Sequence, residues 1–117
     1  MFDVILDKIK ECSGIEPTNR LKKLDGESVI VKIAPKSYDG SVCESSLEVV
    51  CVARDYDTVL ERFDAICEGL DSLCDTDSEV LEVSLSNTAI KYDTVSGMTR
   101  IIGVFKCYTE VSDNGFN

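Results

Sequence analysis

The chain contains no histidine, and this absence removes much of the side-chain chemistry that a protein of 117 residues could carry. A Ser-His-Asp or Cys-His nucleophile needs an imidazole as its base, so neither arrangement can exist within one chain. Phosphate-binding glycine loops of the G-x-x-x-x-G-K and G-x-G-x-x-G types are also missing from the sequence. We therefore expect no catalytic residues, no cofactor-binding residues and no enzymatic activity.

Basic residues are scarce, because 12 Lys and Arg stand against 22 Asp and Glu, for a net charge of −10. This charge repels nucleic-acid phosphate and anionic lipid, so we expect neither sequence-specific nucleic-acid binding nor membrane binding. The one cationic cluster, Arg20, Lys22 and Lys23, has no interleaved aromatics and is typical of an exposed connector. An acidic surface leaves three interpretations open: plain solubility, attraction to a basic protein partner, and mimicry of DNA.

No apolar stretch approaches the ~20 residues that a membrane span needs, and residues 1–4 do not begin a signal peptide. The six cysteines show no C-x-x-C spacing: Cys12, Cys43, Cys51, Cys67, Cys74 and Cys107. Most of them fall on apolar faces, where free cysteine behaves as a small hydrophobe. We expect reduced core thiols in a cytosolic protein. We expect no metal site, since Asp75, Asp77 and Glu79 lack the glycine of a calcium loop and are typical of an exposed acidic turn.

Hydrophobic periodicity predicts two amphipathic helices. The first covers residues 2–12 and ends at Ser13-Gly14. The second covers residues 56–74, with Asp55 or Asp57 as its N-cap. Its apolar stripe consists of Val59, Phe63, Ile66, Leu70 and Leu73. Gly69 lies inside this helix at a cost of roughly 1 kcal/mol relative to Ala, which indicates that a neighbour approaches closely there.

Alternating or β-branched segments predict four strands, at residues 28–33, 46–53, 80–85 and 99–111, with 87–92 prolonging the third after a break. Turn-forming residues predict a loop at 35–43 between the first two strands, and the two strands can also pair as a hairpin turning near Asp39-Gly40. The order α-β-β-α-β-β predicts an α+β fold: a four-stranded, mainly antiparallel sheet with the long helix on one face. We expect a single domain over residues 1–111 and a flexible tail over 112–117.

Three segments in this order carry a resemblance to a known family. A strand reads S-S-L-E-V-V-C-V-A-R-D (residues 45–55), and the helix D-T-V-L-E-R-F-D-A-I-C-E-G-L (57–70) follows it directly. The strand R-I-I-G-V-F-K-C-Y (100–108) ends the domain. The chain thus resembles the tail terminator, or tail-completion, proteins of long-tailed bacteriophages, which are also described as minor capsid proteins.

The resemblance implies a virion structural protein that is made in the host cytoplasm and located in the tail, at the head–tail interface. Such a protein forms a homo-oligomeric ring, commonly a hexamer, on the end of the tail tube. It stops tube polymerisation and docks the head connector, so its partners are itself, the tube protein and the connector protein, while DNA passes through the ring. We expect contacts in the turn-rich loop and the last strand, at Pro35, Lys36, Ser37, Tyr38, Asp39, Gly40, Ser41, Arg100 and Lys106.

Two other classes of function stay open at this point. A small acidic inhibitor of a host or DNA-binding protein fits the net charge and would act as a monomer or dimer. An enzyme whose site is completed by a second subunit is favoured by nothing in the sequence. A ring gives a higher multiple of 12.9 kDa in a mass measurement, whereas a monomer is compatible with both classes, because a terminator can stay monomeric until it meets the tube.

Overall fold

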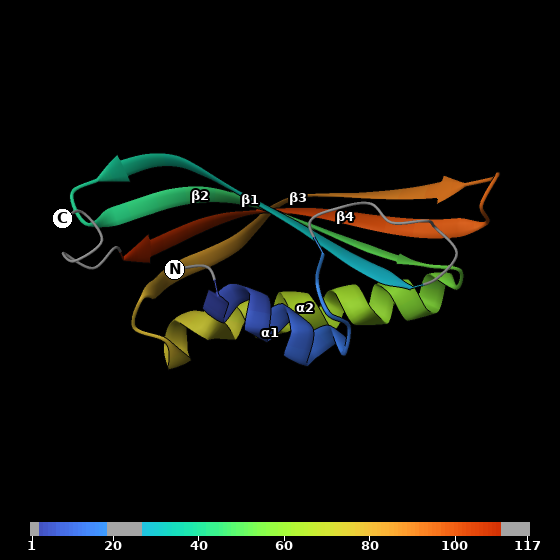
Figure 1. Ribbon diagram of the computed structural model, residues 1–117, viewed down its shortest axis with the longest axis horizontal. Coiled ribbons are helices and arrows are strands. Elements are labelled where there is room, and N and C mark those ends of the chain that lie inside the picture. Colours follow the sequence, from blue (N-terminus) through green and yellow to red (C-terminus); the bar gives the residue numbers. More distant parts are fainter. Residues whose placement is uncertain (1–2, 19–26, 111–117) are drawn as a thin grey trace.

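The computed structural model describes residues 3–18 and 27–110. The elements are α1 (Asp3–Ser13), β1 (Ser28–Asp39), β2 (Val42–Ala53), α2 (Tyr56–Thr76), β3 (Val80–Asp93) and β4 (Met98–Glu110). Both helices lie on the same side of the sheet (Figure 1). The predicted α+β order is therefore confirmed. The predicted flexible tail and the basic cluster at residues 20–23 lie outside the described residues.

The four strands form one sheet in the order β1-β2-β4-β3, and every neighbouring pair is antiparallel. β2 and β4 occupy the middle, and β1 and β3 form the two edges. The strands are long, so the molecule is elongated, with principal extents of 48 × 23 × 23 Å. The segment after α1 runs beside β1, where the Thr18 amide donates to the Val29 carbonyl at 2.9 Å. The outer side of β1 is thus partly occupied by the chain itself.

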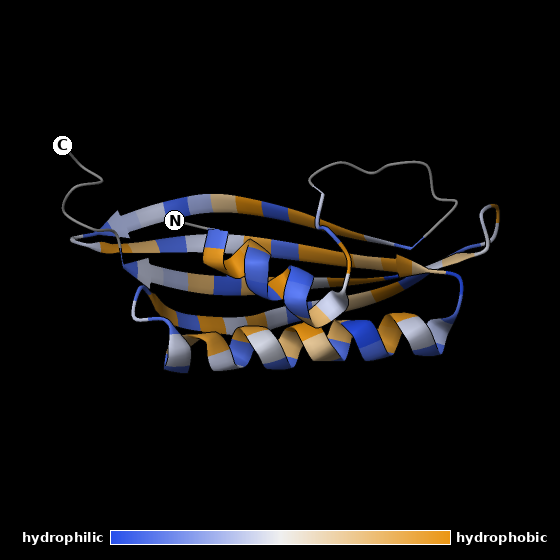
Figure 2. Cartoon of the chain, turned by 60° about the horizontal axis from the view of Figure 1, so that its bottom comes forward, coloured by the Kyte–Doolittle hydropathy of each residue, from blue (hydrophilic) through white to orange (hydrophobic). Residues whose placement is uncertain are grey.

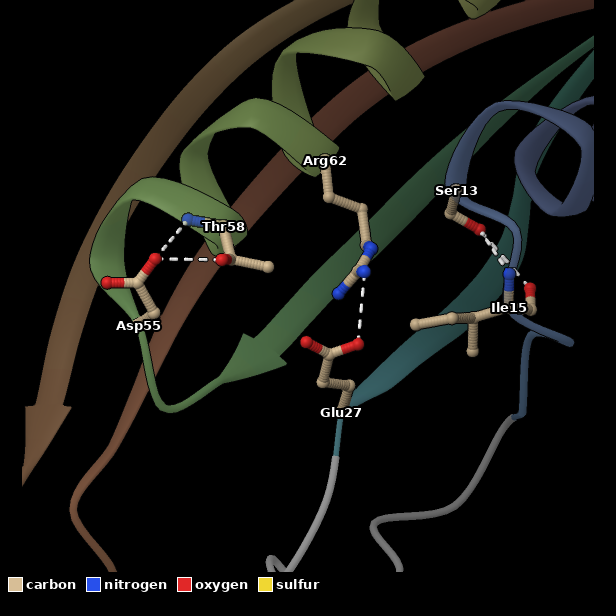
Figure 3. Close-up of polar contacts among 6 residues, drawn as sticks. All are labelled: Ser13, Ile15, Glu27, Asp55, Thr58 and Arg62. Atoms are coloured by element: carbon tan, nitrogen blue, oxygen red, sulfur yellow. Dashed lines mark hydrogen bonds and ion pairs between the residues drawn. The ribbon is translucent and has the colours of Figure 1, made fainter.

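The long helix α2 begins where its cap predicts. The Asp55 carboxylate accepts hydrogen bonds from the Thr58 amide at 3.1 Å and from the Thr58 hydroxyl at 2.8 Å, so Asp55 rather than Asp57 is the N-cap (Figure 3). All five residues of the predicted apolar stripe are buried. At the other end the Asp77 amide donates to the Leu73 carbonyl at 2.9 Å, which closes the last turn.

α2 approaches the sheet closely at Gly103 of β4. A Cβ atom built on Gly103 would lie 2.6 Å from the ring of Phe63, so only glycine lets the ring rest on the strand backbone. Phe105, two residues further along β4, packs against the same ring with the centroids 6.4 Å apart. These three residues fix the position of the helix over the middle of the sheet.

The shorter helix α1 packs beside α2 and buries Ile5 and Ile9 in the same core. The contact is close at Gly69, where an added Cβ would collide with the sulfur of Cys12. The close approach predicted from Gly69 is therefore confirmed. Cys12 is half-buried in this contact.

The helix α2 crosses the sheet diagonally. Arg62, in its first half, forms an ion pair with Glu27 just before β1, with Nη2 and Oε2 3.0 Å apart (Figure 3). Its second half leads directly into β3. In Figure 1 β1 and β2 approach the start of α2, whereas the right-hand halves of β3 and β4 rise away from it. No helix therefore covers the second half of β3.

The Phe63 packing predicts the effect of a truncation. We expect Phe63→Ala to lower the free energy of unfolding by about 3 to 5 kcal/mol, because the ring is buried between α2 and the sheet and its loss leaves a cavity. Denaturant unfolding measures this loss. Glu61→Ala, an exposed change on the same helix, is the control and should stay within about 0.5 kcal/mol. A loss below about 1 kcal/mol for Phe63→Ala would contradict the packing.

The same contact predicts that a larger residue in the strand is harmful. Gly103→Ala should destabilise the protein by about 1 to 3 kcal/mol, since the new methyl group enters the space of the Phe63 ring. Gly14→Ala is the comparison variant: a Cβ at Gly14 meets no atom within 4 Å, so only its φ of 73° is unfavourable. A neutral or stabilising Gly103→Ala, measured by thermal unfolding, would show that the ring is not held against the strand.

Candidate assembly interface

The segment predicted as a loop is the end of a β-hairpin. Residues 34–39 continue β1, Gly40 and Ser41 form the turn, and β2 already begins at Val42. Gly40 has a φ of 62°, the conformation that a two-residue hairpin turn needs at its first position. The predicted hairpin turning near Asp39-Gly40 is therefore confirmed, whereas the loop predicted at residues 35–43 is wrong, because these residues continue the two paired strands. We call residues 34–43 the hairpin arm.

The predicted contact residues of this segment, 35–41, are all exposed on the arm. The strand pairing shifts between Pro35 and Ser37, so Lys36 is the extra residue of a β-bulge. Proline is tolerated in an edge strand at such an irregularity, because no ladder hydrogen bond is lost there. The arm thus presents Lys36 and Tyr38, the latter 55% exposed, on a paired backbone.

The base of the arm is held by side chains as well as by the ladder. Cys43 and Ser45 are buried, with their side-chain sulfur and oxygen 3.5 Å apart. On the helix-free face Tyr108 of β4 donates to the Glu44 carboxylate at 3.1 Å, and this hydrogen bond raises the pKa of the Tyr108 phenol. β2 pairs with β4 from Val42 onward. The arm is therefore an ordered extension of the sheet.

Of the two predicted contact residues in β4, only Lys106 lies near the arm. It is exposed on the helix-free face opposite Ser46, and together with Lys36 and Glu44 it lines a shallow depression. Arg100 lies at the other end of β4, half-buried and opposite Val52. Its Nε is buried without a hydrogen-bond partner among the described residues. The structure thus brings eight of the nine predicted residues together and separates Arg100 from them.

Charge is distributed unequally between the two layers. The helices expose nine carboxylates: Asp3, Asp7, Glu11, Asp57, Glu61, Asp64, Glu68, Asp71 and Asp75. The two helices also contain three cations, and each forms an ion pair: Lys8 with Glu11, Lys10 with Glu16 and Arg62 with Glu27. Figure 2 shows hydrophilic residues along the outward sides of both helices. The helical surface is therefore strongly acidic.

A second exposed surface was not anticipated from the sequence. The edge strand β3 exposes Leu85 to 45%, Ile90 to 52% and Tyr92 to 63%. Their apolar character was visible in the pattern of residues 80–92, but the pattern does not say that α2 turns away from them. This surface and the hairpin arm lie on opposite edges of the sheet.

Within residues 3–18 and 27–110 no group of three His, Cys, Asp or Glu side chains could hold a metal ion. Neither described helix is both long and apolar enough to cross a membrane. The cysteines in the described part are free thiols.

Comparison with known proteins gives a structural likeness without a sequence family. No family model matches the chain, and no curated protein matches it. A chain from the virion of a native gene transfer agent particle has the same fold, with a TM-score of 0.63 over 91% of both chains at 13% identity. A crystal structure from Akkermansia muciniphila matches with a TM-score of 0.44 over 92% of this chain and 46% of that one, which is too low to carry an argument.

The burial of the thiols predicts their reactivity. Desolvation raises the pKa of Cys51 to about 12, and the pKa values of Cys67 and Cys107 to about 11, so the unreactive protonated form persists at neutral pH. Cys74 is exposed. Titration with an aromatic disulfide should show one fast thiol in the native protein and six in denaturant.

The matched control is Cys74→Ser, which should remove the fast phase and leave the slow ones. Disulfide bonds in protein prepared without oxidant would contradict the interpretation of the cysteines as reduced core residues. Labelling of Cys51 or Cys107 as fast as Cys74 would contradict their burial.

Proposed function

We propose that this chain is a structural protein of a long-tailed phage or phage-like particle, a tail terminator that forms a ring on the tail tube and joins it to the head connector. The observation that carries the proposal is the fold shared with a chain of a gene transfer agent virion over 91% of both lengths. The strand–helix order of residues 45–70 supports the same family. The protein performs no chemistry in this role.

The hairpin arm gives the ring a means of assembly. A paired arm that extends past the helices presents exposed side chains at low entropic cost, because its backbone is already ordered. Lys36 of the arm and Lys106 of β4 beside it are cations, and the acidic helical surface of a neighbouring subunit offers them carboxylates. Six subunits, the common number for the family, would then close a ring whose partners are the tube protein and the connector protein.

The acidic helices also suit a position beside passing DNA. Carboxylates facing a channel repel phosphate, so DNA moves past without binding. This role places the protein at the head–tail interface of the virion.

A second candidate is favoured by the same charges. Nine exposed carboxylates on one face suit a small acidic inhibitor that binds a basic surface of a host or DNA-binding protein. Electron microscopy of particles made without the protein separates the two functions. Overlong or unjoined tails support the terminator, whereas tails of normal length attached to heads would remove it and leave the inhibitor.

The arm predicts a variant that folds but does not assemble. Lys36→Glu combined with Tyr38→Asp changes two exposed side chains and removes the hydrogen bond between Tyr38 and Cys43, so the unfolding free energy should fall by no more than about 1.5 kcal/mol. In particles complemented with this variant, the fraction of tails joined to heads should fall several-fold. Lys32→Glu, an exposed change on β1 outside the arm, is the control and should complement normally. Normal joining by the arm variant would exclude the arm as the contact.

A further inference from the structure

Exposed large apolar side chains gather at one edge of the described molecule. Leu81, Leu85, Ile90 and Tyr92 lie on β3, and Val95 lies in the turn that follows it. The others in the described part of the chain are single tyrosines, one on the hairpin arm and one at the start of α2. A concentration of exposed apolar side chains along one edge of a small domain marks a place where another surface binds.

Two apolar side chains of β3 belong to the helix-facing side of the sheet but lie outside the helix cover. Leu85 is opposite Phe105, and Ile90 is opposite Ile101; both β4 partners are buried. Directly opposed residues share a face. Since α2 crosses the sheet diagonally, it covers β4 at these positions but does not cover the neighbouring positions of β3.

The backbone of β3 is also open along its outer edge. The Glu110 amide of β4 donates to the Glu79 carbonyl at 2.7 Å, so the even-numbered residues of β4 direct their backbone groups toward β3. β3 residues that lie opposite odd-numbered β4 residues, such as Val83 and Ile90, therefore direct their N–H and C=O groups outward. Among the described residues no strand pairs with this edge. At the β1 edge, by contrast, Thr18 already occupies part of the ladder.

We propose that β3 pairs with β3 of a second copy of this chain, antiparallel about a two-fold axis perpendicular to the sheet. Overlap of the full 14 residues places the axis between Ser86 and Asn87. This register sets Val83 opposite Ile90 of the second copy, and Glu82 opposite Lys91 of the second copy. The axis repeats each pair, so two apolar pairs and two ion pairs form.

The β-bulge in the middle of β3 makes this register consistent. The pairing with β4 shifts between Leu85 and Asn87, so Ser86 is an extra residue and the alternation of faces changes phase there. Glu82 and Lys91 consequently lie on the same helix-free face, opposite even-numbered residues of β4. Without the bulge the Glu82 and Lys91 side chains would point to opposite faces of the sheet. The register of full overlap would then not bring the Glu82 carboxylate next to the Lys91 ammonium of the second copy.

The contact closes on itself, because the same edge is used by both copies. It yields a continuous sheet of eight strands from two sheets of four, with all helices on one side. It leaves the hairpin arm free. The inference stands apart from the tail-terminator role, since it concerns the purified chain alone.

Sedimentation equilibrium of the purified protein tests the pairing. The wild type should reach twice 12.9 kDa as its concentration rises. Glu82→Lys and Lys91→Glu should each weaken the dimer by on the order of tenfold, because the two-fold axis converts both ion pairs into like-charge pairs. Lys32→Glu, the same change of charge on the other edge strand, is the control and should dimerise like the wild type. Circular dichroism of each variant verifies folding.

Mixing the two weakened variants is the decisive measurement. In the heterodimer one copy carries only cations at positions 82 and 91 and the other only carboxylates, so both facing pairs are of opposite charge. The equimolar mixture of Glu82→Lys with Lys91→Glu should therefore dimerise at least as tightly as the wild type, which also proves that both variants are folded. A monomeric wild type at all concentrations, variants that dimerise unchanged, or a mixture without recovery would each overturn the proposal.

Discussion

The contact between the Phe63 ring and the backbone of Gly103 determines the arrangement of the whole molecule. A glycine in the middle of a long strand lets α2 come down onto the sheet at one point, and the Phe105 ring holds it there. From this point the helix runs toward β1 at one end and β3 at the other. The layer of helices therefore covers a diagonal band, and the surfaces outside that band are the ones left for partners.

β4 is the strand on which both partner surfaces depend. It pairs with β2 over the base of the hairpin arm and with β3 along the apolar edge, so it fixes the position of both. Its helix-facing residues are buried almost throughout, including Ile101, Phe105 and Cys107. A regular central strand thus keeps two irregular edge strands at defined positions. The bulges bend and re-phase the edges without disturbing the core.

The sequence predicted the elements that its own periodicity specifies, and missed those that depend on neighbours. The stripe of α2 and its Asp55 cap are local signals, and both are present in the structure. At the hairpin arm the turn-forming residues Pro35, Asp39 and Gly40 predict a loop. What makes the arm a strand is pairing with β2, which in turn is held by β4; this is a tertiary effect that overrides local propensity.

The exposure of β3 and the place of Arg100 were missed for a related reason. Alternation at Ile90 and Tyr92 indicates which side of a strand is apolar, but the extent of cover depends on the angle at which a helix crosses the sheet. Arg100 and Lys106 share a strand and a face, so sequence spacing alone groups them. Only the position of the arm at one end of β4 separates them.

The two edges of the sheet differ in chemistry, and this difference separates two kinds of association. A ring requires a head-to-tail contact, in which unlike surfaces meet; Lys36 of the hairpin arm and Lys106 beside it are opposite in charge to the acidic helices and can form one. The β3 edge is self-complementary, since it carries a cation and a carboxylate equidistant from its centre, and a self-complementary edge closes after two copies. A chain with both surfaces can cover its apolar edge without forming open filaments. It keeps the arm available for an assembly that begins only where a partner presents the complementary surface.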